Sequence, residues 1–513
     1  MTLTYRSTAG RRLTVTEGDG NIAHLAAADG ITFVQSGTGA TATRVQTKIR
    51  NAVAVDVKSD FGAVGDGVTD DTAAIQAAFD SFTSATGGGL VYIPPGTYLV
   101  SSTLILDVTG MYIYGVTGRT TLKRKNSVAA DTMNIMQTSF EGRYAAAPIT
   151  DVTIYGITFD GNKANNSIGS DDNYDHCLVG FYTDRMQVRN CVAKNAGRLG
   201  IAFTTGADDC VIEGCDVYDC DEGGIYSEVS ENTRFIGNYL EGCSASPFNI
   251  GAICFNNITN GTIAGNVVKT GRDGIYIRNE CSGCSIVGNT CKTQTRYGIW
   301  VYDESEGVAP DTPIHTTITG NTVVDSGDSC VRLQFANDTV VSGNNLDSAH
   351  EYCVEFNNCA RLKISGNDLS GFSVAPILDV GGNSGLTIYG VSGTYTPILT
   401  GAGAAGAGTY SIQVGRYEYA GNRVLFDAVI TWSAHTGTGQ LRFSLPLTVH
   451  ASSNATLRID AYNLAYTDGL AAFAVGSAAY ARLHQNSGGT LSDYAVQGAG
   501  TIFLSGAYEI NGS

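Results

Sequence analysis

A four-residue pattern returns through the middle of the chain: an apolar residue, any residue, glycine and then asparagine. Six clear copies lie at residues 235–238, 263–266, 286–289, 318–321, 341–344 and 364–367. Successive copies start 28, 23, 32, 23 and 23 residues apart. A period of this size is typical of stacked structural repeats, which restricts this part of the chain to an elongated, solenoid-type fold.

The repeats indicate strands, because β-branched residues and glycines dominate them, alternate residues are apolar, and no helical face is present. We therefore predict an all-β fold, a parallel β-helix in which each repeat forms one coil. Asparagine tolerates the left-handed backbone region, so we expect the asparagine of each copy to turn a corner and to hydrogen-bond to the next coil. The two longer steps predict loops at residues 241–250 and 303–316.

Composition restricts the partners. The 513 residues leave room for roughly two to four domains. A net charge of −17 argues against nucleic acid and anionic membranes as partners. No run approaches the length of about 18 apolar residues that a membrane span needs. Residues 1–20 lack the apolar region of a signal peptide, so we expect folding in a cytoplasm and no membrane insertion.

All 13 cysteines lie between Cys177 and Cys359, within the repeats. Cys191 and Cys215 occupy the asparagine slot of successive coils, which predicts stacked, reduced core residues and no disulfide framework. The single CxxC at residues 281–284 lacks further ligands at metal-binding spacing. We therefore predict no metal and no cofactor.

Four regions are expected. Residues 1–50 are too few for a large core and predict an attachment segment stabilised by oligomerisation or by a partner. Residues 51–110 predict a capping helix and first strands, with Asp70 and Asp71 as candidate N-caps. The helix has an apolar face formed by Ile75, Ala78, Phe79 and Phe82. Residues 111–392 form the β-helix, and residues 393–513 predict a β-sandwich-like domain for trimerisation, glycan binding or both.

Four stretches carry a resemblance. DFGAVGDGVTDDTAAIQAA at residues 60–78 and GGGLVYIPPGTY at residues 87–98 resemble the N-terminal signature of the pectate-lyase-like β-helix superfamily. FVQSGTGATATRVQTKIR at residues 33–50 and LTYRSTAGRRLTVTEGDGN at residues 3–21 are similar to parts of bacteriophage tailspikes.

The resemblance implies a right-handed β-helix, the usual hand of a parallel crossover. It also implies a homotrimeric virion protein that is attached to the phage tail or an adaptor through residues 1–50. Such a protein binds, and often cleaves, host surface polysaccharide.

An apolar residue about 13 positions after the start of most repeats predicts a second inward strand position, as at Ile275 and Ile299. Side chains alternate along a strand, so residues one and three places later should face outward. The first outward column is Ala202, Tyr226, Ile253, Tyr276, Trp300, Arg332 and Glu355. The second is Thr204, Glu228, Phe255, Arg278, Tyr302, Gln334 and Asn357. A charged column precedes them: Arg198, Glu222, Arg272, Arg296, Asp328 and Glu351.

Because neighbouring coils lie about 4.8 Å apart, these columns should form one continuous surface. Aromatic planes, guanidinium groups and carboxylates together suit an extended glycan groove. The predicted substrate-binding residues are Tyr226, Arg272, Tyr276, Arg278, Trp300, Tyr302, Arg332 and Glu355. The alternative is that the outward aromatic residues pack between the protomers of a trimer.

Glycoside hydrolysis needs two carboxyl groups, one as acid and one as base or nucleophile. The candidate catalytic residues are Glu222, Glu228, Asp273 and Asp303. A lyase would instead need a base and a cation beside a uronate, for which Arg272, Arg278 or Tyr302 could serve. We expect an endo-acting polysaccharide depolymerase. The alternatives are a polysaccharide lyase, a non-catalytic receptor-binding fibre and a purely structural virion protein. For Asp160, Asp175 and His176, a polar cluster near the early coils, we predict loop roles.

Overall fold

The computed structural model describes residues 54–138, 148–244, 250–303, 313–347 and 350–510, except residues 422, 448, 450–453 and 467. It also describes four short strands before residue 54. Those strands are β1 (Leu3–Arg6), β2 (Arg12–Val15), β3 (Thr32–Phe33) and β4 (Thr43–Arg44). They pair antiparallel, β1 with β2 and β3 with β4. The rest of the predicted attachment segment lies outside the described residues, as does most of the two predicted loops.

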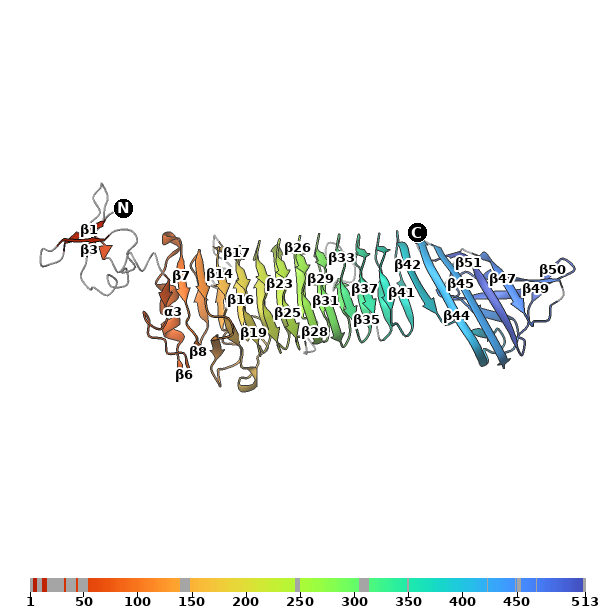
Figure 1. Ribbon diagram of the computed structural model, residues 1–513, viewed down its shortest axis with the longest axis horizontal. Coiled ribbons are helices and arrows are strands. Elements are labelled where there is room, and N and C mark those ends of the chain that lie inside the picture. The colour runs from red at the N-terminus through yellow and green to blue at the C-terminus, as the bar shows by residue number, and fades with distance from the viewer. Residues whose placement is uncertain are drawn as a thin grey trace.

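The body of the molecule is a rod of stacked coils built from three parallel sheets (Figure 1). Sheet 1 runs from β5 (Val55–Asp56) through β7 (Gly89–Tyr92) to β42 (Thr387–Tyr395). Sheet 2 runs from β6 (Asp66–Asp70) to β40 (Asp368–Ser370). Sheet 3 contains β9 (Leu104–Leu106), β12 (Met136–Thr138), β16 (Leu178–Phe181), β20 (Leu199–Thr204), β23 (Gly223–Glu231), β26 (Ile253–Thr259), β29 (Ile275–Arg278), β32 (Ile299–Tyr302), β35 (Ser329–Gln334), β38 (Tyr352–Asn357) and β41 (Ala375–Gly381). The predicted parallel β-helix is confirmed.

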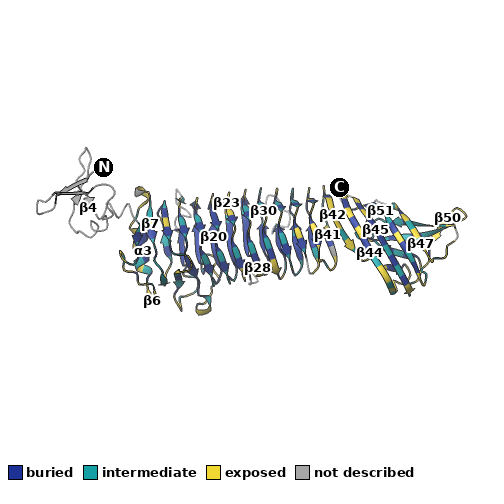
Figure 2. Cartoon of the chain, in the orientation of Figure 1, coloured by how far each residue is buried: buried dark blue, intermediate teal, exposed yellow. Residues whose placement is uncertain are grey.

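The core is the inside of the coil, and buried residues recur along the whole rod (Figure 2). In one coil the inward positions are Ile263 from sheet 1, Val268 from sheet 2, and Ile275 and Ile277 from sheet 3, all fully buried. All 13 cysteines are buried and form no disulfide, as predicted; Cys254 belongs to a cluster outside the coil and the other 12 to the core. Since successive coils add equivalent positions, the core extends along the rod without interruption.

The asparagines of the repeat form a ladder along the coil axis: Asn238, Asn266, Asn289, Asn321, Asn344 and Asn367. The first five donate from Nδ2 to the Oδ1 of the next asparagine at 2.8–2.9 Å. All six donate from Nδ2 to a backbone carbonyl of the preceding coil. The predicted hydrogen bonds are therefore confirmed, but the predicted backbone role is wrong. The glycine before each ladder asparagine takes the left-handed conformation, with φ of 61–65°, because it has no Cβ to clash.

Helix α3 (Thr72–Asp80) lies at the first coil and buries Ile75, Ala78 and Phe79, which confirms three of the four predicted apolar positions. The fourth, Phe82, follows the helix and packs partly buried against the core. Asp71 holds the N-cap position, but its carboxylate instead accepts from the backbone amides of Val64 and Gly65 at 2.6 and 3.0 Å. The Asp70 carboxylate accepts from the Thr72 amide at 3.2 Å. The helix thus covers the end of the core and ties down the loop before it.

The C-terminal strands are antiparallel. One sheet continues from β42 through β44 (Gly408–Gly421), β45 (Arg423–His435), β51 (Gly500–Glu509) and part of β47 (Ala455–Tyr462). The second contains β43 (Leu399–Gly401), β46 (Leu441–Ser444), β49 (Tyr480–Ser487), β48 (Gly469–Ala474) and β50 (Thr490–Asp493). Side chains such as Val424, Ile430 and Leu483 fill the space between them, which fits the predicted sandwich.

We expect Asn289→Ala to destabilise the β-helix. Asn266 would lose its acceptor, and the buried carbonyl of Ile263 would lose its donor. Unsatisfied buried groups of this kind should lower the free energy of unfolding by about 3 kcal/mol, measured by denaturant unfolding. The control is Asn345→Ala, an exposed asparagine on an outer strand position. Equal stability of the two variants would contradict a stabilising role for the ladder.

Candidate functional site

The first outward column of sheet 3 lies in register across seven coils. Its members are Ala202, Tyr226, Cys254, Tyr276, Trp300, Arg332 and Glu355. The prediction that Ile253 belongs to this column is wrong, since Ile253 pairs with Ile225 and Ile275 and faces the core. In the second column Asn256 replaces the predicted Phe255 for the same reason. The repeat that contains β26 is longer than its neighbours, so the sequence alignment of this strand was wrong by one residue.

The aromatic members of these columns stack on one another outside the coil but are not exposed. The Trp300 ring lies 4.5 Å from Tyr276 and 4.9 Å from Tyr302, nearly parallel to both. Tyr276 is fully buried and Trp300 is 6% exposed, in an outer cluster separate from the coil interior. The Arg296 guanidinium covers Trp300 at 4.3 Å. The prediction that Tyr276 and Trp300 form an open sugar-stacking surface is therefore wrong, because neighbouring side chains already cover the rings.

Several predicted site residues are occupied by ion pairs. The fully buried carboxylate of Asp273 accepts two hydrogen bonds from the Arg296 guanidinium, with Arg272 Nε at 4.0 Å. Arg332 donates to Glu355 and to the Tyr297 hydroxyl, both at 2.8 Å. These contacts hold neighbouring coils together and leave Asp273 poorly placed for proton transfer. Asp303 directly follows β32 and is also fully buried.

A hollow of about 250 Å³ brings the other predicted residues together. It is lined by Glu222, Tyr226, Glu228 and Arg278 from the predicted set. Asn256, Asp172, Asn173 and His176 line it as well, with Val179, Phe181, Leu199, Thr204, Thr205 and Ile250. The hollow thus lies over β16, β20, β23, β26 and β29, against the chain segment that joins β15 (Thr158–Asp160) to β16.

Glu222 lies just before β23, and its side chain is 8% exposed. Arg198 Nη1 lies 3.1 Å from one oxygen of Glu222 and 2.6 Å from the Asp172 carboxylate. Burial raises the pKa of Glu222, and the Arg198 guanidinium only partly opposes this effect. A buried carboxyl group with a raised pKa, with a second carboxyl group in the same hollow, is suited to general acid chemistry.

Burial also raises the pKa of Tyr226 well above its usual range, and the neighbouring Glu228 carboxylate adds to this effect. The Tyr226 hydroxyl therefore stays protonated and can donate a hydrogen bond to a ligand. Arg278 contributes a positive charge to the same hollow. Donors, a cation and two carboxyl groups together can bind sugar hydroxyls and transfer protons.

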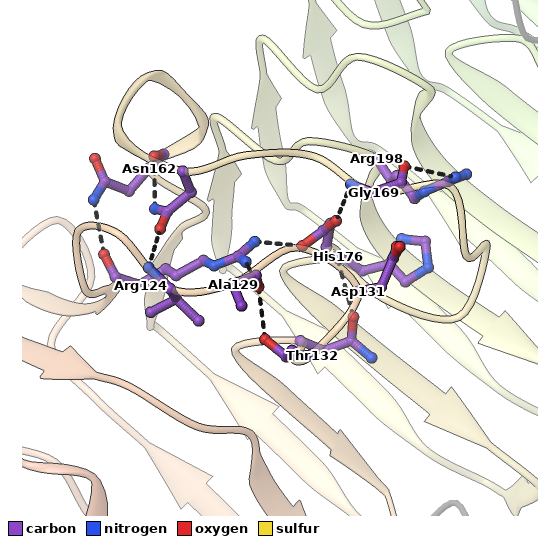
Figure 3. Close-up of polar contacts among 12 residues, drawn as sticks. Arg124, Ala129, Asp131, Thr132, Asn162, Gly169, His176 and Arg198 are labelled. Atoms are coloured by element: carbon purple, nitrogen blue, oxygen red, sulfur yellow. Dashed lines mark hydrogen bonds and ion pairs between the residues drawn. The ribbon is translucent and has the colours of Figure 1, made fainter.

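The segment at residues 161–177 forms one wall of the hollow and is anchored by buried polar contacts (Figure 3). Arg124, at the end of β11 (Thr120–Arg124), donates to Asp175 at 2.6 Å. Asp175 also accepts from the Gly169 amide at 2.9 Å, and Arg198 donates to the Gly169 carbonyl at 3.3 Å. Asp160 accepts from the Asn162 amide at 3.0 Å. The contacts of Asp175 agree with its predicted loop role. Asp160 is instead the last residue of β15, and its carboxylate bonds to the turn that follows the strand.

His176 joins this wall to sheet 3 as a neutral ring. Its Nδ1 accepts from the Leu199 amide at 3.0 Å, so its Nε2 carries the proton and donates to the Asp172 carbonyl at 2.8 Å. Burial lowers the pKa of His176 from 6.5 to about 4. The ring therefore remains neutral at physiological pH.

Sequence reasoning missed Asn256, Arg198, Asp172 and Asn173 as lining or supporting residues of the hollow. Arg198 belongs to the predicted charged column, so its position on the outer face could be predicted. Its burial could not, because it depends on contacts with residues 169 and 172. The segment at residues 161–177 lies outside the repeat pattern, so the sequence did not predict its position beside sheet 3. Within the described ranges, no helix is long and apolar enough to cross a membrane, and no group of His, Cys, Asp and Glu forms a metal site.

We expect Trp300→Ala to cost stability, because its buried ring stacks between two tyrosines. Loss of a buried tryptophan should lower the free energy of unfolding by about 3–5 kcal/mol, measured by denaturant or thermal unfolding. Tyr462→Ala is the control, since Tyr462 is 60% exposed on the C-terminal domain. An unchanged melting temperature in Trp300→Ala would place the ring on a free surface.

We expect acid to weaken the anchoring of residues 161–177 through His176. The unfolded ring takes up a proton near pH 6.5, whereas the folded ring does so only near pH 4. The contribution of His176 is thus complete above pH 6.5 and is lost as the pH falls toward 4. The difference in local opening free energy between the unchanged chain and His176→Gln should shrink by about 3 kcal/mol over this window. Hydrogen exchange of residues 161–177 measures it, with His435→Gln as the control.

Three family models match successive parts of the chain. Residues 54–171 match "Rhamnogalacturonase A/epimerase, pectate lyase-like", residues 181–311 match "Right handed beta helix region", and residues 248–390 match "Periplasmic copper-binding protein (NosD)". Mannuronan C5-epimerase AlgE5 of Azotobacter vinelandii is 40% identical over 115 residues, 21% of this chain and 11% of that protein. Alginate lyase 7 of the same organism is 31% identical over 226 residues, 42% of this chain and 23% of that protein. The matches thus span less than a quarter of the length of these curated relatives.

Two solved structures are similar over most of the chain. The Dettilon tailspike protein superimposes with a TM-score of 0.52 at 17% identity, covering 91% of this chain and 96% of that one. A protein of Geobacillus virus E2 gives a TM-score of 0.50 at 16% identity, covering 90% and 84%. At these identities the likeness concerns the fold. The coiled architecture and the matched models show a right-handed parallel β-helix that is similar, over residues 54–171, to the pectate lyase-like family model.

Proposed function

We propose that the protein is a bacteriophage tailspike that binds and depolymerises host surface polysaccharide, such as capsule, O-antigen or exopolysaccharide, as an endo-glycosidase. The observation that carries this proposal is the presence of Glu222 and Glu228 in one hollow outside the coil. Burial gives Glu222 a raised pKa, as a general acid requires. Glu228, which accepts a hydrogen bond from Asn256 at 2.9 Å, is then the base or nucleophile.

In this mechanism Glu222 donates its proton to the leaving glycosidic oxygen, and Glu228 activates water or attacks the anomeric carbon. Arg278 and the Tyr226 hydroxyl bind sugar oxygens beside them. Arg272 and Tyr302, which are only partly buried, offer further contacts along the rod. The role of the segment at residues 161–177 is to cover one side of the bound glycan and to exclude water.

The tailspike assignment is supported by the tailspike-like segments within residues 1–50 and by a fold shared with the Dettilon tailspike protein over nearly its whole length. We further propose a homotrimer that attaches to the phage tail or an adaptor through residues 1–50. The C-terminal domain would contribute trimer contacts, glycan binding or both. The protein would fold in the host cytoplasm and act as part of the virion.

A polysaccharide lyase is the second candidate. It is favoured by Glu228 and Arg278 in the same hollow, because elimination needs a base and a cation beside a uronate. Relatives named as an alginate lyase and mannuronan epimerases also point to uronate polymers.

Mass spectrometry of products from host-surface glycan separates these candidates. Hydrolysis adds water to each fragment, whereas elimination leaves an unsaturated end. Binding of the glycan without shorter products would instead indicate a receptor-binding fibre.

We expect Glu222→Gln and Glu228→Gln each to lower the rate of glycan cleavage at least about a hundredfold, because each removes one of the two carboxyl groups. The rate is measured as new reducing ends per unit time. Glu231→Gln is the control, since Glu231 lies exposed at the end of the same strand. Cleavage by Glu228→Gln at the unchanged rate, from a chain with an unchanged melting temperature, would remove Glu228 from the mechanism.

A further inference from the structure

Asn256 occupies the centre of a hydrogen-bond chain in the hollow. Its Nδ2 donates one hydrogen to the Tyr226 hydroxyl at 3.1 Å and the other to Glu228 Oε1 at 2.9 Å. Its Oδ1 accepts from Asn279 Nδ2 at 2.7 Å. Asn256 is 6% exposed, so water competes little for these bonds. Every hydrogen-bonding position of the amide is thus directed by a neighbour.

The direction of these bonds decides where protons can lie. The amide presents a donor to Glu228, and a donor stabilises the ionised carboxylate over the protonated form. The same amide donates to the Tyr226 hydroxyl, which must therefore use its own hydrogen elsewhere. Among the described residues the Tyr226 hydroxyl makes no other hydrogen bond, and Tyr226 lines the hollow. Its hydrogen is available to a ligand there.

Asn279 fixes the orientation of the amide. It follows β29, directly after Arg278, and takes the left-handed conformation with φ of 55° at the turn. Its donated hydrogen bond requires the oxygen of Asn256 on that side, which leaves the nitrogen facing Tyr226 and Glu228. The register of β26 with β29 places these groups on adjacent coils.

We propose that Asn256 is the positioning residue that assigns the two proton-transfer roles in this hollow, by presenting its amide donor to Glu228 and by directing the Tyr226 hydrogen toward the substrate. The inference rests on the proposed cleavage of a glycan at this site. It distinguishes Glu228 from Glu222, which has no amide donor of this kind and is instead paired with Arg198. The two carboxyl groups therefore have different surroundings before any substrate binds.

The test replaces the amide by a carboxyl group in the full chain. In Asn256→Asp an acceptor faces Glu228, so the two carboxyl groups compete for one proton and the Tyr226 hydrogen turns toward residue 256. We expect kcat/KM at pH 7 to fall about a hundredfold and the acidic limb of its pH profile to move up by about one pH unit or more. Asn256→Ala, which adds no charge, should lose about tenfold with a smaller displacement of that limb.

The matched control is Asn454→Asp, an exposed asparagine of the C-terminal domain whose side-chain oxygen accepts from the Gly476 amide. It should leave the pH profile unchanged. Loss of activity in Asn256→Asp without movement of the acidic limb would overturn the proposal, because a merely structural residue would act in that way.

A second measurement does not depend on cleavage. In a chain labelled with ¹³C at the glutamate carboxyl carbons, the Glu228 signal is assigned by its absence in Glu228→Gln. We expect this signal to titrate at least about one pH unit higher in Asn256→Asp than in the unchanged chain. An unmoved titration overturns the role of Asn256 even if the glycan is cleaved. A displaced titration in a chain that cleaves no glycan supports Asn256 and rejects the proposed function.

Discussion

Backbone hydrogen bonds join each coil to the next in one register, from Val55 beside Val91 at the first coil to Lys363 beside Thr387 near the last. A shift by one residue would exchange the inward and outward side chains of a whole strand. The asparagine ladder opposes such a shift, because its amides bond only when the slots of successive coils coincide. Residues 23 to 32 positions apart therefore become neighbours on a common surface.

The outer face of sheet 3 uses this regularity to bury charge. Asp273 with Arg296 and Glu355 with Arg332 are pairs between adjacent coils, and removal of either arginine would leave a buried carboxylate without its nearest cation. Glu222 differs from these acids because it also faces the hollow. The same construction therefore gives ion pairs between coils along part of the face, and a hollow lined by two carboxyl groups where Asp172, Asn173 and His176 lie against it.

The repeat period was sufficient to predict the sheets, the buried cysteines and the alignment of Tyr226, Tyr276 and Trp300, because these features repeat with the coil. It could not predict the burial of Trp300, which depends on Arg296 and on stacking between side chains rather than on strand alternation. The additional residues before β26 led the alignment to place Phe255 where Asn256 lies, because an error of one residue exchanges the inward and outward side chains of a strand. Asp172 and Asn173 lie in a segment without a period, so no pattern indicated their approach to Glu222.

The interior thiols have a further consequence for how the molecule is handled. Burial raises the pKa of Cys177 and Cys291 to about 12, so these two thiols carry almost no reactive thiolate in the folded coil. All 13 cysteines are buried, so oxidants and alkylating reagents reach them only where coils have opened. Since the cysteines are distributed from Cys177 to Cys359, the order in which they are modified reports which coils of the rod separate first. An oxidant that acts before the coils have closed would instead join thiols that lie apart in the finished rod.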